Sequence, residues 1–204
     1  EVLYSAHGFL MYQINAKSAG ATPVAAPETN LTANVDALLD AVTHRTKMLF
    51  LANPNNPTGS YLPANELRRL RKGLPDHVLM VIDAAYAEYV SRNDYVSGAE
   101  LVEKHDNVVM TRTFSKAFGL AAVRLGWAYC PAEVADVLNR VRNPFNVTAP
   151  AQAAGIAAVS DLSHTDAAIA HNDEWLLKFT VELQNLGYEV APSVGNFVLV
   201  RFDT

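Results

Sequence analysis

Asp83 is the first residue of this sequence whose type and position could do chemistry. It directly follows the apolar run 78–82, where a carboxylate is poorly solvated unless a cation or other donors lie beside it. The residues alone leave two interpretations open. Asp83 caps a helix or pairs with a protein arginine, or it faces the protonated ring nitrogen of a bound cofactor. Tyr86, three residues later, could lie on the same side.

The segment TRTFSKAFG, residues 111–119, is the second candidate. Thr113 and Ser115 place hydroxyls close to Lys116, and Arg124 follows eight residues after the lysine. An arginine with neighbouring hydroxyls supplies the charge-assisted donors that a phosphate needs. A lysine among apolar neighbours and near another cation has a lowered pKa, so its free amine can act as a nucleophile. An ordinary surface lysine is the alternative.

The third candidate is the loop NPNNPTG, residues 53–59, which follows the apolar pair Phe50-Leu51. Proline and glycine punctuate turns, and asparagine side chains cap the backbone, so a rigid turn is one interpretation. The other is that the stiff loop aims one amide side chain at a ligand. The sequence has neither a Walker-type Gly-Lys-Ser/Thr pattern nor a Gly-x-Gly-x-x-Gly fingerprint, so it does not support a nucleotide site.

Buried strands alternating with helices must position these segments. Continuous apolar strands are typical of a sheet that is covered on both faces. This alternation predicts an α/β fold with a mostly parallel central sheet. In such sheets ligands collect beyond the carboxyl ends of the strands. The predicted strands are residues 47–51, 78–82 and 107–111, and the predicted helices are residues 34–39 and 63–72, with Pro63 as first helical residue and Gly73 just past the end.

The pattern changes near residue 160. Residues 161–186 form one long helical stretch that ends at Gly187, and two strand patterns follow at 188–190 and 197–202. We therefore expect a domain transition there. Arg201 lies in an alternating strand, which favours a solvated edge position.

Composition narrows the classes of function. Of 204 residues, 50% are hydrophobic and 18% are charged, which is typical of a globular chain. The formal net charge of −5 gives no general attraction to nucleic acid or anionic lipid. No apolar run reaches the roughly 18 residues of a membrane-spanning helix. The single cysteine, Cys130, excludes an internal disulfide and favours a reducing compartment. No metal site is predicted.

The three motifs occur in one order: NPNNPTG, then VIDAAYAEY, then TFSKAFGLAAVRLGW. In that order and spacing they resemble the class I/II pyridoxal-phosphate aminotransferases of fold type I. The segments AHGFLMY (6–12), VSRNDY (90–95) and NPFNV (143–147) most resemble the histidinol-phosphate aminotransferases within that group. The similarity covers nearly the whole chain. It implies a three-layer α/β large domain over residues 1–160, lacking its N-terminal part. Residues 161–204 would be a connecting helix and a partial small α/β domain.

The resemblance also implies roles for single residues, with pyridoxal 5'-phosphate as the cofactor. Lys116 would form the Schiff base with the aldehyde, and Asp83 would pair with the pyridine nitrogen and keep it protonated. The released Lys116 amine would then act as general base at the substrate Cα. The implied catalytic residues are Lys116, Asp83 and Tyr86. The remaining implied residues bind the cofactor. Asn56 and Tyr86 would bind its 3-oxygen, and Phe9 would lie against the ring face. The phosphate would be held by Thr113, Ser115 and Arg124.

The function that the resemblance implies is transamination between L-histidinol phosphate and 2-oxoglutarate in histidine biosynthesis, with ping-pong kinetics. An aromatic amino-acid aminotransferase or an amino-acid phosphate decarboxylase would use the same cofactor residues, and a non-catalytic cofactor-binding domain is a further alternative. Family members form homodimers, so we expect a cytoplasmic homodimer without a nucleic-acid or membrane partner. Both termini look like cuts through a longer chain. We expect a phosphate-binding turn upstream and the substrate-carboxylate arginines downstream.

Overall fold

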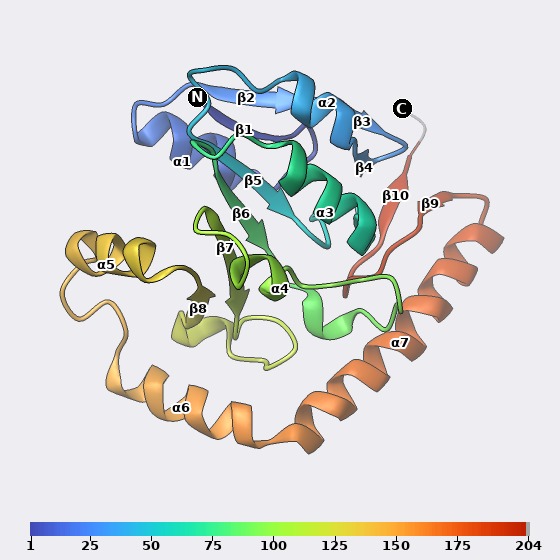
Figure 1. Ribbon diagram of the computed structural model, residues 1–204. Coiled ribbons are helices and arrows are strands. Elements are labelled where there is room, and N and C mark those ends of the chain that lie inside the picture. Colours follow the sequence, from blue (N-terminus) through green and yellow to red (C-terminus); the bar gives the residue numbers. More distant parts are fainter. Residues whose placement is uncertain (203–204) are drawn as a thin grey trace.

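A six-stranded sheet forms the centre of the computed structural model, which describes residues 1–202 (Figure 1). The strand order is β2-β1-β5-β6-β7-β8. Neighbours from β2 to β7 run parallel, and β8 is antiparallel to β7. The fold is therefore α/β with a mostly parallel central sheet, as predicted. The bounds are β1 Val2–Ser5, β2 Pro23–Ala26, β5 Met48–Ala52, β6 Leu79–Asp83, β7 Val108–Thr113 and β8 Gly126–Tyr129.

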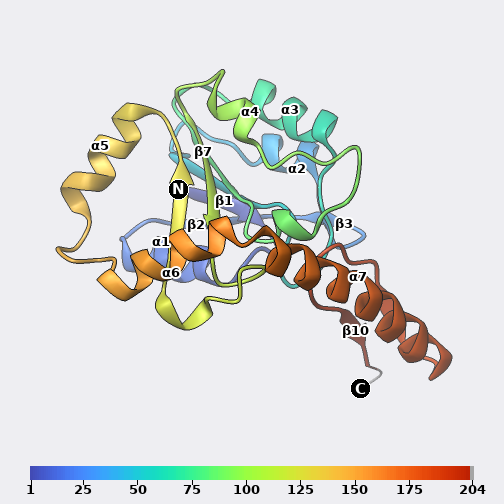
Figure 2. The ribbon, with the colours of Figure 1, turned by 90° about the horizontal axis from the view of Figure 1, so that it is seen from below.

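Helices cover both faces of this sheet, which makes the three layers. Figure 2 shows α2, α3 and α4 on one side and α1 and α6 on the other. The parallel strands are joined by crossovers that carry most of these helices, because a parallel pair cannot be closed by a tight hairpin. The helices are α1 Met11–Ser18, α2 Val35–Asp40, α3 Ala64–Gly73, α4 Ala99–Val102, α5 Ala132–Val141, α6 Ala149–Ser160 and α7 Leu162–Asn185, with short 3₁₀ turns at Ala87–Tyr89 (η1) and Ala121–Val123 (η2).

The core lies between the sheet and the layer of α2, α3 and α4. Apolar side chains of the central strands meet leucines of the helices there, and many are fully buried. Burying one such side chain stabilises the fold by about 1.5–3 kcal/mol. This packing fixes the strands whose carboxyl ends carry the candidate motifs. Fully buried members are Leu3, Leu38, Leu49, Leu67, Leu70, Val78, Met80, Ile82, Ala84 and Val108.

The predicted strands 47–51, 78–82 and 107–111 are confirmed as β5, β6 and β7 within one or two residues. Helix α2 begins as predicted, because the Asn34 side chain accepts a hydrogen bond from the Ala37 N–H. The expected ends of α3 are wrong by one residue. Pro63 is the cap before the helix, with extended backbone at ψ 161°, and Gly73 is its last residue.

The chain after α6 leaves the sheet along α7 and comes back as a small antiparallel ladder of β9 Glu189–Ala191 and β10 Leu199–Arg201 (Figure 1). The predicted strand at 188–190 is therefore confirmed with a shift of one residue, and the predicted strand at 197–202 is confirmed with shorter bounds. Arg201 is exposed, as expected, and its Nη1 lies 3.3 Å from Glu189 Oε2.

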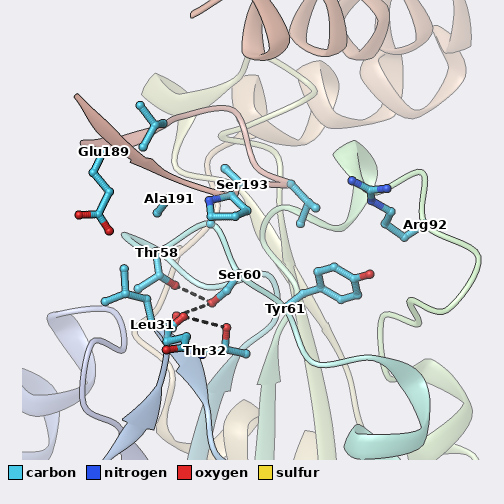
Figure 3. Close-up of a pocket in the computed structure, with 14 residues that line it drawn as sticks. Leu31, Thr32, Thr58, Ser60, Tyr61, Arg92, Glu189, Ala191 and Ser193 are labelled. Atoms are coloured by element: carbon cyan, nitrogen blue, oxygen red, sulfur yellow. Dashed lines mark hydrogen bonds between the residues drawn. The ribbon is translucent and has the colours of Figure 1, made fainter. Parts of the chain in front are cut away.

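The returning segment contacts the Asn-Pro loop, residues 53–59. The Val194 N–H donates to the Gly59 carbonyl at 3.0 Å, and a Cβ at Gly59 would overlap the Ser193 side chain. Beside this contact lies a cavity of about 500 Å³, which Figure 3 shows between Ser193, Glu189, Arg92 and the Thr58–Ser60 hydroxyls. The C-terminal segment thus lies against the Asn-Pro loop, which carries the candidate site residue Asn56.

Candidate active site

The carboxyl ends of β5, β6 and β7 meet at one edge of the sheet. Asp83 is the last residue of β6, and the register places it between Ala52 of β5 and Thr111 of β7. Thr113 ends β7, and the segment with Ser115 and Lys116 follows directly. Parallel strands therefore deliver three separate sequence motifs to one place, which is where open α/β sheets bind their ligands.

All eight predicted site residues line one cavity of about 420 Å³ at this edge. They come from four regions of the chain, and the most distant pair is 115 positions apart in sequence. The structure thus brings together every side chain that the motifs single out. Their roles toward a cofactor stay predictions. The eight are Phe9, Asn56, Asp83, Tyr86, Thr113, Ser115, Lys116 and Arg124.

The Asp83 carboxylate is largely buried and accepts hydrogen bonds from neutral donors. Its Oδ2 accepts from the Tyr12 hydroxyl at 2.8 Å, and its Oδ1 accepts from the Ala85 N–H at 3.2 Å. Burial raises the pKa of Asp83 above its usual range, although these hydrogen bonds and the charge of Lys116 oppose that shift. Among residues 1–202, no ion pair includes Asp83. The alternative of a protein arginine as its partner is therefore wrong for the described chain.

Lys116 lies on the same cavity as Asp83. Its Nζ is 5.1 Å from the centre of the Tyr86 ring, so the ammonium faces an aromatic surface. The Tyr86 hydroxyl accepts a hydrogen bond from Asn56 Nδ2 at 3.2 Å. The amide and the phenol are thus adjacent, and together they can donate to one oxygen of a ligand.

The phosphate candidates follow β7. The Ser115 N–H donates to Thr113 Oγ1 at 3.1 Å, which closes a tight turn and keeps both hydroxyls on the cavity. Arg124 adopts φ +56°, an uncommon backbone conformation for a long side chain, and its Nη1 donates to the Ala121 carbonyl at 2.6 Å. The ion pairs within residues 1–202 do not include Arg124, so its charge is available to an anion in the cavity.

Sequence reasoning missed three features that support the site. Tyr12, at the start of α1, reaches Asp83 and stacks on Phe50 with ring centres 5.0 Å apart. Phe197, from the C-terminal segment, packs edge-on against Tyr86 at 5.2 Å. The only local signal for Tyr12 is its spacing of three from Phe9, which places both at one helix start.

The third missed feature is an ion pair beneath the cavity. Arg112 Nη2 donates to Glu88 Oε1 at 2.5 Å, and the side chains are 19% and 9% exposed. The pair joins the turn after Tyr86 to β7 just before the Lys116 segment. It therefore ties together two of the regions that line the cavity.

Residues 1–202 contain no cluster of three or more His, Cys, Asp or Glu side chains arranged to hold a metal ion. Within the same range, no helix is long and apolar enough to cross a membrane. The cavity at the sheet edge is therefore the one on which the candidate chemistry rests.

At the carboxyl edge of this α/β sheet a lysine, an aspartate and an arginine thus line one cavity. A family model for aminotransferases of class I and II matches residues 1–203, and the chain belongs to that family. The predicted resemblance is thereby confirmed.

The relatives that match this chain include histidinol-phosphate aminotransferases. The chain is 67% identical over 202 residues to histidinol-phosphate aminotransferase of Paramagnetospirillum magneticum and 64% identical to that of Rhodospirillum centenum. Each alignment covers 99% of this chain but 56% of the relative, so the chain spans little more than half the relatives' length. A solved histidinol-phosphate aminotransferase from Sinorhizobium meliloti, in complex with pyridoxal-5'-phosphate, superposes with a TM-score of 0.93 at 30% identity, covering 98% of this chain and 54% of that one.

Proposed function

We propose that this chain is the cofactor-binding part of a pyridoxal-phosphate-dependent aminotransferase that converts L-histidinol phosphate and 2-oxoglutarate. The observation that carries the proposal is the cavity at the sheet edge, which is lined by both Lys116 and Asp83. Asp83 forms no ion pair within residues 1–202 and accepts a hydrogen bond from the neutral Tyr12 hydroxyl. The choice of substrate is supported by the relatives at 64–67% identity, which are named for that amino donor.

The side chains of the cavity fit pyridoxal phosphate by their chemistry. The Asp83 carboxylate accepts hydrogen bonds only from neutral donors, so it lacks a positively charged partner, and a protonated ring nitrogen would supply one. Asp83 would in turn keep that nitrogen protonated, because a nearby opposite charge favours the charged form. Arg124 and the two hydroxyls of Thr113 and Ser115 would hold the phosphate. The cofactor, when bound, supplies an electron sink for negative charge at the substrate Cα.

The remaining residues would orient the ring and move the proton. Asn56 and Tyr86, already in contact at 3.2 Å, would donate to the 3-oxygen. Phe9 would cover one face of the ring. The Lys116 amine would hold the cofactor through its aldehyde carbon, and it would also serve as the general base that takes the proton from the substrate Cα.

We also propose an organisation for the protein. Residues 1–160 would form the large domain, and residues 161–204 the connecting helix and the start of a smaller domain. The departure of α7 from the sheet supports this, although residues 203–204 lie outside the described part. A cytoplasmic homodimer is the proposed state, as in the family resembled. Phe145 is 94% exposed after α5, which supports a covered interface there. Light scattering on the intact protein tests the dimer.

Two measurements on the intact protein test the function. Borohydride reduction after incubation with pyridoxal phosphate should leave a pyridoxyl label on the peptide that contains Lys116, and Lys116→Ala should abolish both the label and turnover. Lys104→Ala, which changes a lysine outside the cavity, is the control. A label that persists in Lys116→Ala would refute the assignment, and labelled protein without turnover would favour the non-catalytic alternative.

The substrate is tested by comparing kcat/KM for histidinol phosphate, phenylalanine and tyrosine with 2-oxoglutarate as acceptor. We expect the highest value for histidinol phosphate. A higher value for the aromatic amino acids would favour an aromatic aminotransferase, and release of CO₂ from an amino-acid phosphate would favour a decarboxylase on the same scaffold.

A further inference from the structure

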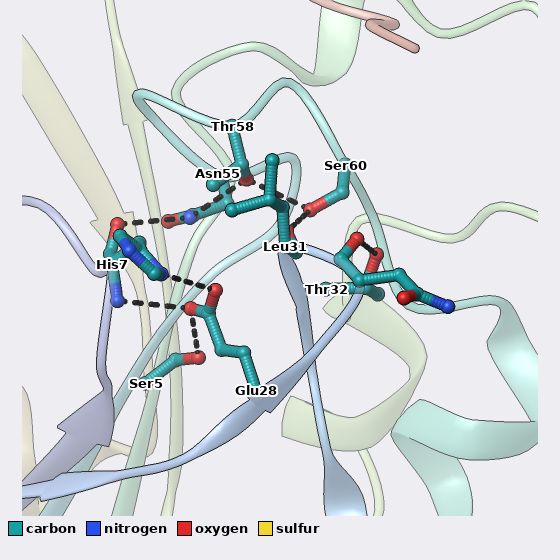
Figure 4. A network of polar contacts seen from close by, with 9 residues as sticks. Ser5, His7, Glu28, Leu31, Thr32, Asn55, Thr58 and Ser60 are labelled. Atoms are coloured by element: carbon teal, nitrogen blue, oxygen red, sulfur yellow. Dashed lines mark hydrogen bonds and ion pairs between the residues drawn. The ribbon is translucent and has the colours of Figure 1, made fainter. Parts of the chain in front are cut away.

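Glu28, in the short strand β3 (Glu28–Thr29) that pairs with β4 (Thr32–Ala33), holds a second buried carboxylate outside the cavity. Its side chain is only 4% exposed. Oε1 accepts from the Ser5 hydroxyl at 2.5 Å and from the His7 N–H at 3.0 Å, and Oε2 lies 2.8 Å from His7 Nδ1 (Figure 4). Since a carboxylate only accepts, His7 Nδ1 carries a hydrogen here. Glu28 therefore receives three donors from one short turn.

That turn leads directly to Phe9. The Gly8 N–H donates to the Ser5 carbonyl at 2.6 Å, and a Cβ at Gly8 would lie only 2.8 Å from the same oxygen. The turn is thus tight, and the backbone from Ser5 to His7 is fastened to the carboxylate. Phe9, two residues after His7, follows this fastened turn directly and lines the cavity.

The same network fastens the Asn-Pro loop. Asn55 Nδ2 donates to the His7 carbonyl at 3.0 Å and to Thr58 Oγ1 at 2.9 Å. The Thr58 hydroxyl lies 2.8 Å from that of Ser60, which in turn donates to the Leu31 carbonyl at 2.7 Å. Figure 4 shows this chain of contacts running from Glu28 through His7 and back to the β3–β4 turn. Asn56, next to Asn55, is therefore held by the same structure as Phe9.

We propose that Glu28 is a positioning residue for Phe9 and Asn56, acting through His7 without touching the cavity. This inference rests on the proposed function, because it assigns Glu28 the role of setting two side chains that would contact the cofactor. The negative charge of Glu28 is what allows it to hold this turn. Hydrogen bonds to a carboxylate are about twice as strong as neutral ones, and three of them hold one turn.

Glu28→Gln tests the proposal with almost unchanged size. One carboxylate oxygen becomes an amide NH₂, and the negative charge is lost. The hydrogen bonds from Ser5 and His7 then lose their charge assistance and weaken, even if the His7 ring moves its hydrogen to Nε2 and accepts from the amide. In the intact cofactor-free protein we expect faster amide hydrogen exchange in peptides covering residues 5–10 and 53–60. We also expect the dissociation constant for pyridoxal phosphate to rise about tenfold, which corresponds to the loss of one charged hydrogen bond.

Glu100→Gln is the matched control. Glu100 pairs with Arg68 at 2.6 Å on the far helices, so the variant loses an ion pair without touching either loop. It should leave exchange in both peptides and cofactor affinity unchanged. Ser5→Ala removes a single donor to Glu28 and should give a smaller change in the same direction, which keeps the test valid if Glu28→Gln does not fold.

The outcomes separate two failures. If the wild-type protein does not bind pyridoxal phosphate, the proposed function fails, whatever the exchange data show. If the wild type binds it and Glu28→Gln or Ser5→Ala matches the wild type in exchange, the positioning inference alone is overturned. Faster exchange with unchanged cofactor affinity also overturns it, because a merely structural role would then explain the network.

Discussion

Replacing Tyr12 by Phe removes one hydroxyl from beside the candidate site and leaves the ring in place. The Tyr12 ring stacks on Phe50, and its hydroxyl donates to Asp83 Oδ2 at 2.8 Å. A hydrogen bond to a charged group contributes about 1.5–3 kcal/mol, against about 0.5–1.5 kcal/mol for a neutral pair. We therefore expect Tyr12→Phe to lower the free energy of unfolding by about 1.5–3 kcal/mol where Asp83 is ionised.

The loss should depend on pH in a defined direction. Burial raises the pKa of Asp83 above 3.8, and removing a donor from its carboxylate raises that pKa further. A carboxyl whose folded pKa exceeds its unfolded value stabilises the protein when protonated, and this contribution is lost as pH rises through the folded pKa. The cost of Tyr12→Phe is thus largest at neutral pH. It falls to about 0.5–1.5 kcal/mol once Asp83 is protonated.

Urea unfolding of the cofactor-free protein at a series of pH values measures this dependence. Tyr4→Phe is the matched control, since Tyr4 is equally buried at 7% exposure and its hydroxyl makes no hydrogen bond within residues 1–202. In an Asp83→Asn background, Tyr12→Phe should cost no more than a neutral hydrogen bond, which isolates the coupling of the two residues. The reasoning is refuted if Tyr12→Phe behaves like Tyr4→Phe at neutral pH, or if its cost does not change with pH.

Two further changes test the supports of the cavity by urea unfolding. Arg112→Gln leaves the Glu88 carboxylate, 9% exposed and with Oε2 already lacking a partner among the described residues, without its cation. The expected loss is about 3 kcal/mol, and a loss below about 1 kcal/mol would contradict burial of the pair. Gly59→Ala and Gly20→Ala both place alanine at a positive φ, +73° at Gly59 and +72° at Gly20. Only the Cβ added at Gly59 overlaps a neighbour, the Ser193 side chain. Gly59→Ala should cost about 1–3 kcal/mol more, and equal costs would contradict the contact.

Three of the six strands of the central sheet, β5, β6 and β7, were predictable from their apolar sequences, whereas β1, β2 and β8 were not predicted. Residues 48–52 and 78–82 are apolar runs of strand length, and a strand covered on both faces of the sheet does not need alternation. The site residues were predictable for a related reason. Asp83 and Thr113 end strands, so any parallel sheet with these strands adjacent brings them to one edge.

Contacts between distant segments were not predictable in the same way. Tyr12 and Asp83 are 71 positions apart, and they meet because β1 inserts between β2 and β5 in the sheet order. The apolar pattern gives strand positions but not strand order. The Glu28 network was unpredictable for the same reason. Glu28 begins a two-residue strand, and nothing in its local sequence distinguishes it from an exposed acid. Its burial depends on the turn after β1, which lies beside it only in the folded chain. The one-residue error at Pro63 is different, because proline suits both the cap and the first turn.

The segment that carries Phe9 is fastened on both sides by a buried carboxylate. Before Phe9, His7 is held by Glu28, and after it, Tyr12 is held by Asp83. Asp83 therefore has two tasks, since it faces the cavity and also holds the start of α1. A change at Asp83 must disturb both the charge of the cavity and the Phe9 segment, whereas a change at Glu28 disturbs the Phe9 segment and the Asn-Pro loop but leaves the charge on the cavity unchanged. Comparing the two separates what electrostatics contributes to this site from what geometry contributes.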